Sequence, residues 1–252
     1  MAQVSYDAFA DVYDALMADV DYDAWADYLQ EFLQQAPRRV RRVTEAGCGT
    51  GSISLRLAAR GYEVTATDLS PEMLAVGAER AREAGVHIRF ARQDVGALEL
   101  GRCDALVCAC DVLNYLPPER LPAVFSRAFA GLARGGVLLF DLSSPSKLRG
   151  TLAGQVYYED RDDLSYFWRN TWADDPPRVE MDLTFFLRRG DLYERRDERQ
   201  VQYVHETAEV LRLLSAAGFS AAAYAFGTHL PPGEETDRIF FAAYKPAEAP
   251  NF

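Results

Sequence analysis

The sequence predicts an α/β protein with a mostly parallel sheet, and two observations lead to this prediction. Between residues 40 and 144, apolar runs typical of buried strands alternate with segments of helical periodicity. Such alternation calls for parallel strands joined by right-handed crossovers. The second observation is a glycine-rich turn at residues 47–51, between the first of these strands and the first helix. A strand, such a turn and a helix in this order present backbone N–H groups to a ligand.

The boundaries of the expected elements follow from turn residues and from changes of pattern. The first 36 residues carry apolar side chains at helical spacing, among them Trp25, Tyr28 and Phe32, and Pro37 closes this segment. The strands are expected at residues 40–45, 62–67, 86–91, 104–109 and 137–142, and the helices near residues 53–58, from Pro71 onward and at 118–132.

A different pattern begins after Pro145. Residues 155–205 are rich in aromatic and charged side chains and alternate in stretches such as V-E-M-D-L-T-F-F-L, with turns at D-D-P-P and R-R-G-D. We therefore expect three or four antiparallel strands inserted after the fifth strand. A helix at 207–217 and two strands at 219–226 and 238–244 then complete the sheet. The expected division is a helical cap (1–36), an α/β domain (37–150 and 206–246) and the antiparallel insert (151–205).

The glycine-rich turn reads E-A-G-C-G-T-G, from Glu45 to Gly51. A dinucleotide-binding G-x-G-x-x-G pattern fails here, because its third glycine would fall on Ser52 or Ser54. A phosphate-binding P-loop needs a lysine, and the turn has none. Glu45 would also repel a diphosphate, and it would suit a ligand with a cationic amino-acid end. The alternative is an ordinary tight β–α turn.

Asp68 ends the second expected strand, 17 residues after Gly51. A carboxylate at this place can accept hydrogen bonds from both hydroxyl groups of a ribose. Ser70 is suited to cap the following helix and Pro71 to its first position, so Asp68 is expected in the turn above that helix. Met73 is placed to pack against a flat ring.

Polar side chains also follow the fourth expected strand, in the run C-D-V-L-N-Y-L. Ligands of open α/β sheets bind at the carboxyl ends of the strands, near the point where the strand order reverses. We therefore expect Asp111, Asn114 and Tyr115 at the border between a cofactor and a substrate. The alternative is a loop held together by its own Asn and Asp side chains.

Composition limits the class of protein. The net charge of −11 argues against nucleic acid as the main partner, because phosphate binding needs concentrated positive charge. No apolar run approaches the roughly 20 residues of a membrane span, and the acidic N-terminus does not read as a signal peptide. The four cysteines are expected as free thiols, and the three histidines lack the spacing for a zinc site with them. We expect a cytoplasmic enzyme with no metal and no membrane partner.

Several motifs together resemble one family. These are the opening Y-D-A-F-A-D-V-Y-D-A-L-M, the glycine turn, D-L-S-P-E-M-L, D-V-L-N-Y-L and the closing E-T-D-R-I-F-F-A-A-Y-K. The chain resembles class I S-adenosylmethionine (SAM) dependent methyltransferases, and within them a small bacterial subfamily with an antiparallel insert. The resemblance implies a Rossmann-like, seven-stranded, mostly parallel sheet, with the small antiparallel β insert after strand 5 covering the substrate pocket. Aspartate is commoner in the family where Glu45 stands here, and the charge is kept.

The resemblance also implies the residues that bind SAM. The aspartate of the second motif, Asp68, would bind the ribose, and Asp94 would hold the adenine amino group unless it is only a surface turn residue. Tyr13 would fold over the cofactor, with a plain core position as the alternative. The expected cofactor-binding set is Tyr13, Glu45, Gly47, Cys48, Gly49, Gly51, Asp68, Leu69, Met73, Asp94, Val95 and Cys110.

The sequence indicates the residues that would contact the methyl acceptor less specifically than those that would bind SAM. A general base is needed only if the nucleophile arrives protonated, and the candidates are Asp111, Tyr115 and His205. A surface position beside Glu206 is the alternative for His205. The expected substrate-binding residues are Asn114, Tyr115, Tyr157, Tyr166 and Trp168, and for the last three the alternative is the core face of the insert sheet.

The expected function is transfer of a methyl group from SAM to nitrogen or oxygen of a small-molecule acceptor. One alternative is a non-catalytic regulatory module that binds SAM or S-adenosylhomocysteine. Another is a methyltransferase of protein or RNA, for which Arg188, Arg189, Arg195 and Arg196 offer a local basic patch. A charged solvent face of the insert explains that patch equally well. A homodimer is compatible with the sequence.

Overall fold

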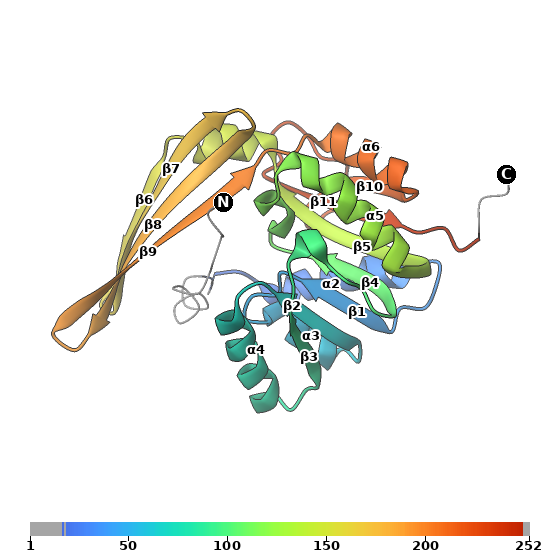
Figure 1. Cartoon of the computed structure of the whole chain (residues 1–252), viewed down its shortest axis with the longest axis horizontal. Coiled ribbons are helices and arrows are strands. Elements are labelled where there is room, and N and C mark those ends of the chain that lie inside the picture. The colour runs from blue at the N-terminus through green and yellow to red at the C-terminus, as the bar shows by residue number, and fades with distance from the viewer. Residues whose placement is uncertain (1–16, 18, 249–252) are drawn as a thin grey trace.

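The computed structural model describes residue 17 and residues 19–248. In this part of the chain a seven-stranded sheet with the order β10-β11-β5-β4-β1-β2-β3 is accompanied by a separate four-stranded sheet, β6-β7-β8-β9 (Figure 1). The predicted fold class is therefore confirmed. The elements up to the fifth strand are α2 (Tyr22–Gln35), β1 (Arg42–Ala46), α3 (Ser52–Ala59), β2 (Glu63–Asp68), α4 (Pro71–Glu83), β3 (Ile88–Arg92), η1 (Val95–Ala97), β4 (Cys103–Cys108), η2 (Val112–Tyr115), η3 (Pro118–Arg120), α5 (Leu121–Gly131) and β5 (Leu132–Ser143).

The second half of the chain forms the insert and closes the large sheet. Its elements are η4 (Lys147–Leu152), β6 (Val156–Asp160), β7 (Leu164–Asp174), β8 (Pro177–Arg189), β9 (Leu192–Tyr203), α6 (Thr207–Ala217), β10 (Ser220–Ala225) and β11 (Arg238–Tyr244). Strands β1 to β5 pair in parallel, whereas β11 runs antiparallel to both β5 and β10. The strand order reverses between β1 and β4, and ligands bind at such a switch point in open α/β sheets.

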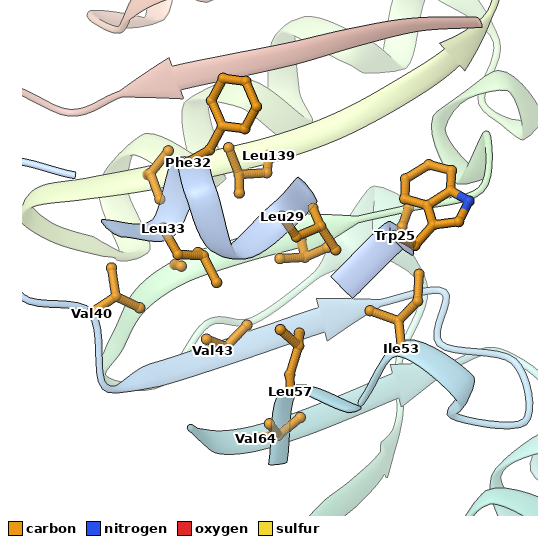
Figure 2. Packing of buried hydrophobic residues seen from close by; sticks show 14 of the residues in the cluster. Trp25, Leu29, Phe32, Leu33, Val40, Val43, Ile53, Leu57, Val64 and Leu139 are labelled. Carbon is orange, nitrogen blue, oxygen red and sulfur yellow. The ribbon is translucent and has the colours of Figure 1, made fainter. Parts of the chain in front are cut away.

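Helix α2 covers one face of the large sheet. Asp21 caps it by accepting a hydrogen bond from the Ala24 N–H at 2.9 Å. Its apolar stripe includes Leu29, Phe32 and Leu33, all almost fully buried, and Figure 2 shows them in one cluster with Val43 of β1. Each such side chain contributes about 1.5–3 kcal/mol when buried. Helices α5 and α6 belong to a second cluster, which contains the other side chains of β4, β5 and β11.

The insert is a long antiparallel sheet that projects from one side of the Rossmann-like domain (Figure 1). Both predicted turns are present. The D-D-P-P turn contains a cis Asp175–Pro176 bond and joins β7 to β8, and the R-R-G-D turn contains Gly190 and joins β8 to β9. Met73, at the start of α4, packs in a cluster with Leu164, Phe185 and Leu187 of the insert. This contact holds the insert close to the carboxyl edge of the large sheet.

Among the element boundaries that differ from the expectation, those of the third and fifth strands have local causes. The third strand begins at Ile88 rather than residue 86, because the Val86 N–H bonds back to the Ala81 carbonyl at the end of α4 (3.1 Å). The fifth strand begins at Leu132 rather than residue 137, because Leu132 already pairs with Cys103 before a bulge. Neither difference moves the site.

Candidate functional site

A cavity of about 900 Å³ lies at the carboxyl ends of β1 to β4, at the switch point. Its walls come from the turn after β1, the ends of β2, β3 and β4, helix η3, and strands β8 and β9 of the insert. The predicted residues that line it are Glu45, Gly47, Cys48, Gly49, Asp68, Leu69, Met73, Asp94, Val95, Cys110 and Tyr115. Gly51 is not among the lining residues and instead occupies the N-cap position of α3. Tyr13 lies outside the described residues.

The glycine turn is held against the end of β2. The Gly47 and Cys48 N–H groups donate to the Thr67 carbonyl at 2.7 and 2.9 Å. Gly47 has φ of +74°, and a Cβ added there would lie 2.4 Å from Cγ2 of Val112. Only glycine therefore lets the turn after β1 approach the turn after β4 so closely.

Glu45 is a buried acid on the wall of the cavity, with 2% of its surface exposed. Ser54 of α3 donates a hydrogen bond to its Oε2. Burial raises the pKa of Glu45 to about 8, and nearby Asp68 adds to the effect. No cation in the described part of the chain pairs with Glu45, so the site suits a ligand that brings its own positive charge.

The Asp68 carboxylate is oriented by two backbone groups. Oδ2 accepts from the Gly49 N–H at 2.8 Å, and Oδ1 accepts from the Ser70 N–H at 2.9 Å. Ser70 in turn caps α4 through the Met73 N–H at 3.2 Å, as predicted. The acid therefore faces the cavity in one orientation, beside the glycine turn.

Asp94 lies at the far end of the cavity. Its Oδ1 accepts from the Gly96 N–H at 2.8 Å, and its Oδ2 pairs with Arg120 at 3.1 Å. Arg120, at the end of η3, also lines the cavity, and the sequence analysis did not identify it.

The segment after β4 is strained. Cys110 and Asp111 both adopt left-handed conformations, with φ of 60° and 55°. Such conformations cost about 1–3 kcal/mol each in residues other than glycine. Cys110 lines the cavity, and its thiol is free, as are those of Cys48, Cys103 and Cys108. The predicted state of the cysteines is confirmed.

The structure does not place Asp111 as a base. Its carboxylate is turned inward, where Oδ2 accepts from Gln202 at 2.7 Å and from Ser143 at 3.2 Å, and Oδ1 lies 3.5 Å from Arg238. Despite its burial, these partners lower the pKa of Asp111, with Arg238 acting most strongly. Asp111 is absent from the cavity wall and acts as a structural anchor.

Asn114 has a structural role of the same kind. It accepts from the Ser143 N–H at 2.9 Å and donates to the Ser143 carbonyl at 3.3 Å and to the Tyr203 carbonyl at 3.0 Å. The alternative, a loop held by its own Asn and Asp side chains, is therefore correct for Asp111 and Asn114.

His205 lies neither on the cavity wall nor on the surface, the two positions expected from the sequence. It is 4% exposed rather than on the surface, and its Nε2 lies 3.2 Å from the Leu113 carbonyl. Burial lowers its pKa, so the ring is neutral at physiological pH. His205 does not reach the cavity wall, which removes it from the candidate bases.

The aromatic residues expected to line the substrate wall belong to the core face of the insert. Tyr157 and Trp168 pack with tilted rings whose centroids lie 5.2 Å apart, in a cluster with η4, and Tyr166 packs against Phe185. None of the three lines the cavity, so the core alternative is correct for them.

Instead, the insert contributes charged residues to the cavity wall. Arg178, Glu180 and Arg199 are joined in one ion-pair cluster across β8 and β9, and Tyr203 lies beside η2. Of the residues expected on the acceptor side, Tyr115 lines the cavity, and its hydroxyl donates to Gln200 at 3.2 Å.

Comparisons with known proteins agree with this geometry. Residues 43–136 match a family described as a methyltransferase domain. The crystal structure of a SAM-dependent methyltransferase from Clostridium acetobutylicum ATCC 824 superposes with a TM-score of 0.86 at 29% identity, covering 96% of this chain and 99% of that one. A Geobacillus sp. (strain WCH70) protein that is named a methyltransferase is 37% identical over 247 residues, 96% of this chain and 100% of its own length.

The chain belongs to the class I SAM-dependent methyltransferases. YqeM of Bacillus subtilis (strain 168), also named a methyltransferase, is 34% identical to this methyltransferase over 244 residues, 95% of this chain and 97% of YqeM. The cofactor is SAM. In this methyltransferase, the buried acid Glu45 without a cation and the close-approach turn at Gly47 fit a cofactor that carries an amino group.

The described residues contain neither a membrane-spanning helix nor a metal-binding cluster. No helix among them is long and apolar enough to cross a membrane. Within the same residues, no group of three or more His, Cys, Asp and Glu side chains is arranged to hold a metal ion.

Proposed function

We propose that this methyltransferase acts on a nitrogen or oxygen atom of a small-molecule acceptor. The observation that carries the proposal is the extent of the cavity, which runs from the glycine turn to Tyr115 and on to Arg178 and Tyr203 of the insert. Its volume of about 900 Å³ is near the upper end of the range for small-molecule sites. This size supports room for an acceptor beside the cofactor, with the insert as its cover.

We assign the two acids nearest the glycine turn to different ends of SAM. Glu45 would bind the amino group, because it is buried without a cation. Asp68 is oriented by the Gly49 and Ser70 N–H groups beside the glycine turn, and its carboxylate would accept hydrogen bonds from the ribose hydroxyl groups. Asp94, at the far end, would receive the adenine.

This placement agrees with the chemistry of the reaction. SAM supplies, when bound, a methyl group on a positively charged sulfur atom. That charge is lost in the transition state, so carboxylates close to the sulfur would stabilise the ground state instead. The protein has to align the acceptor and exclude water, and alignment alone can lower a barrier by several kcal/mol. Tyr115 is the candidate to orient the acceptor, since it lies on the wall between η2 and the insert.

The structure weakens the case for an RNA acceptor. In the basic patch on the insert, Arg189 and Arg196 pair with Glu194 at 3.2 and 2.9 Å, and Arg195 pairs with Asp197 at 2.9 Å. The positive charge of the patch is therefore largely compensated by these carboxylates. This favours the interpretation of the patch as a solvent-exposed face of the insert over an RNA-binding surface.

Calorimetry with SAM and S-adenosylhomocysteine tests the cofactor site. We expect micromolar binding by the wild type and a loss of at least about tenfold in Asp68→Ala, since a charge-assisted hydrogen bond contributes about 1.5–3 kcal/mol. Asp68→Asn has nearly the same shape but can accept from only one of the Gly49 and Ser70 N–H groups, so thermal unfolding of both variants separates a loss of ligand binding from a loss of folding. Unchanged affinity in both variants would contradict the assignment of Asp68.

A second experiment tests the acceptor class. The protein is incubated with methyl-labelled SAM and a bacterial extract that has been separated into small molecules and macromolecules. We expect the label in the small-molecule fraction, and none there with Asp68→Ala. Label only in protein or RNA would overturn the small-molecule proposal, and SAM binding without any transfer would favour the regulatory alternative.

A further inference from the structure

A second concave site, of about 490 Å³, lies at the opposite edge of the large sheet. It is formed where α2 ends, by the linker that leads to β1 and by residues 60–62 between α3 and β2. No lining residue is shared with the cofactor cavity. Helix α2 connects the two, with Tyr22 in the first site and Gln34 in the second, and a helix rises about 18 Å over that length.

The charge of this second site is opposite to that of the whole chain. Among the residues that line it there is no aspartate or glutamate, although the net charge of the chain is −11. The sequence run R-R-V-R-R at residues 38–42 supplies most of its basic groups. The polar lining residues are Gln30, Gln34, Arg38, Arg39, Arg41, Arg60 and Tyr62.

Two of the four arginines that line the second site form ion pairs with other parts of the fold. Arg38 pairs with the buried Asp104 at 3.1 Å and donates to the Arg134 carbonyl at 3.1 Å. Arg60 pairs with Asp27 on α2. These bonds hold the walls in place and compensate two of the four positive charges.

The other two arginines carry uncompensated charge. Arg39 and Arg41 are exposed, and no carboxylate in the described part of the chain forms an ion pair with either side chain. The main chain is held on either side of Arg39, because the Arg41 N–H donates to Asp104 Oδ2 at 3.1 Å and the Arg38 N–H donates to the Gly135 carbonyl at 3.2 Å. A concave site therefore presents two arginines that form no ion pair with any described residue.

We propose that this second site binds a small phosphate-bearing anion. A guanidinium group presents paired N–H donors that match phosphate oxygens, and the glutamine amides and the Tyr62 hydroxyl can donate to further oxygens. The volume is that of a small-molecule site, which favours a ligand with a few phosphate groups over a long polymer. The proposal depends on neither the acceptor nor the cofactor assignment.

Calorimetric titration with pyrophosphate at low salt tests the site. We expect a dissociation constant below about 1 mM for the wild type, weakening as salt is added. The double variant Arg39→Ala and Arg41→Ala should bind at least about tenfold more weakly, because both free cations are lost.

A matched control removes two exposed arginines elsewhere. Arg82→Ala and Arg212→Ala, on α4 and α6, make the same change in net charge, and pyrophosphate affinity should stay at the wild-type value. SAM titration of all three proteins checks that each is folded. The proposal is overturned if the wild type does not bind pyrophosphate, or if both double variants lose affinity equally. Binding of a single-stranded RNA oligonucleotide through Arg39 and Arg41, without binding of pyrophosphate, would also overturn it.

Discussion

Glu45 is a buried acid whose protonation depends on what binds beside it. In the ligand-free protein its pKa is about 8, so the side chain is mostly neutral at pH 7. A cationic group in the cavity would favour the carboxylate and lower that pKa. Binding of SAM through Glu45 must therefore release a proton.

We predict that SAM affinity falls as the pH is lowered from 8 to 6, by at most about tenfold per unit for one proton. Calorimetry at pH 7 in two buffers with different ionisation enthalpies measures the released proton directly. Glu45→Gln cannot release it, so the pH dependence should disappear in this variant. Equal proton release by both proteins would show that another group is responsible.

Gly96 controls the position of Arg120. A Cβ added at Gly96 would lie 2.0 Å from Nη2 of Arg120, so Gly96→Ala must displace that guanidinium from Asp94. If these two residues shape the adenine end of the site, Gly96→Ala and Arg120→Ala should weaken S-adenosylhomocysteine binding by a similar factor, about fivefold to thirtyfold for a lost interaction of 1–2 kcal/mol.

The control for this pair is Arg149→Ala, which removes a surface ion pair with Glu206 away from the cavity and should leave the affinity unchanged. Wild-type affinity in both Gly96→Ala and Arg120→Ala would mean that the adenine lies elsewhere.

At the scale of elements, Arg238 joins β11 to β5 and to the start of η2. It pairs with Asp141, which is fully buried, and with Asp111 at 3.5 Å. Gln202 of β9 donates to the same Asp111, so the insert is attached to this network. The strained Cys110–Asp111 segment is therefore held from three sides.

We predict that Arg238→Met lowers the free energy of unfolding by about 3 kcal/mol, because two buried carboxylates lose their cation. Urea unfolding measures the change. Arg212→Met breaks only an exposed pair with Glu209 on α6 and should change stability by less than about 1 kcal/mol. Equal effects of the two variants would argue against a role of the network in stability.

At the scale of the whole molecule, two buried acids make the ligand-free protein more stable in mild acid. Burial raises the pKa of Asp141 to about 6 and that of Glu45 to about 8, above their ordinary values of 3.8 and 4.5. The folded state therefore holds both protons more tightly than the unfolded chain. The resulting stability is fully present below the ordinary values and is lost as the pH rises through about 6 and then 8.

We predict that the melting temperature of the ligand-free protein decreases as the pH rises from about 4.5 to about 8, and that the part above about pH 6, where only Glu45 still changes its protonation, is absent in Glu45→Gln. Below about pH 4 the trend should reverse, because ion-paired acids such as Asp104, whose pKa is lowered by Arg42, then lose their charge. A melting temperature that is constant or rises from pH 6 to 9 would contradict the raised pKa of Glu45.

Most of the cavity wall around the glycine turn could be predicted from the sequence. The glycine turn follows β1, Asp68 ends β2 and Asp94 lies two residues after β3, and parallel strands bring their carboxyl ends to one edge. Their place in the fold therefore depends on local pattern and on a general rule of topology. Arg120 was missed because nothing in its local sequence indicates that η3 returns to the end of β3.

The acceptor side could not be predicted in the same way. Both faces of the insert strands carry aromatic and charged residues, so alternation alone does not tell which face meets the cavity. The aromatic residues Tyr157, Tyr166 and Trp168 were therefore expected on the cavity wall. In the structure the insert contributes charged residues to that wall instead, namely Arg178, Glu180 and Arg199.

The sequence by itself determined the alternation of strands and helices and the antiparallel insert. It also determined a glycine turn whose neighbouring acid, Glu45, would repel a diphosphate. These follow from periodicity and from the backbone requirements of glycine. Only the tertiary structure decided that Asp111, Asn114 and His205 are used internally and that charged insert residues face the cavity. The reason is that bonds such as Gln202 to Asp111 join residues 91 positions apart, and they form only once the insert has docked on the large sheet.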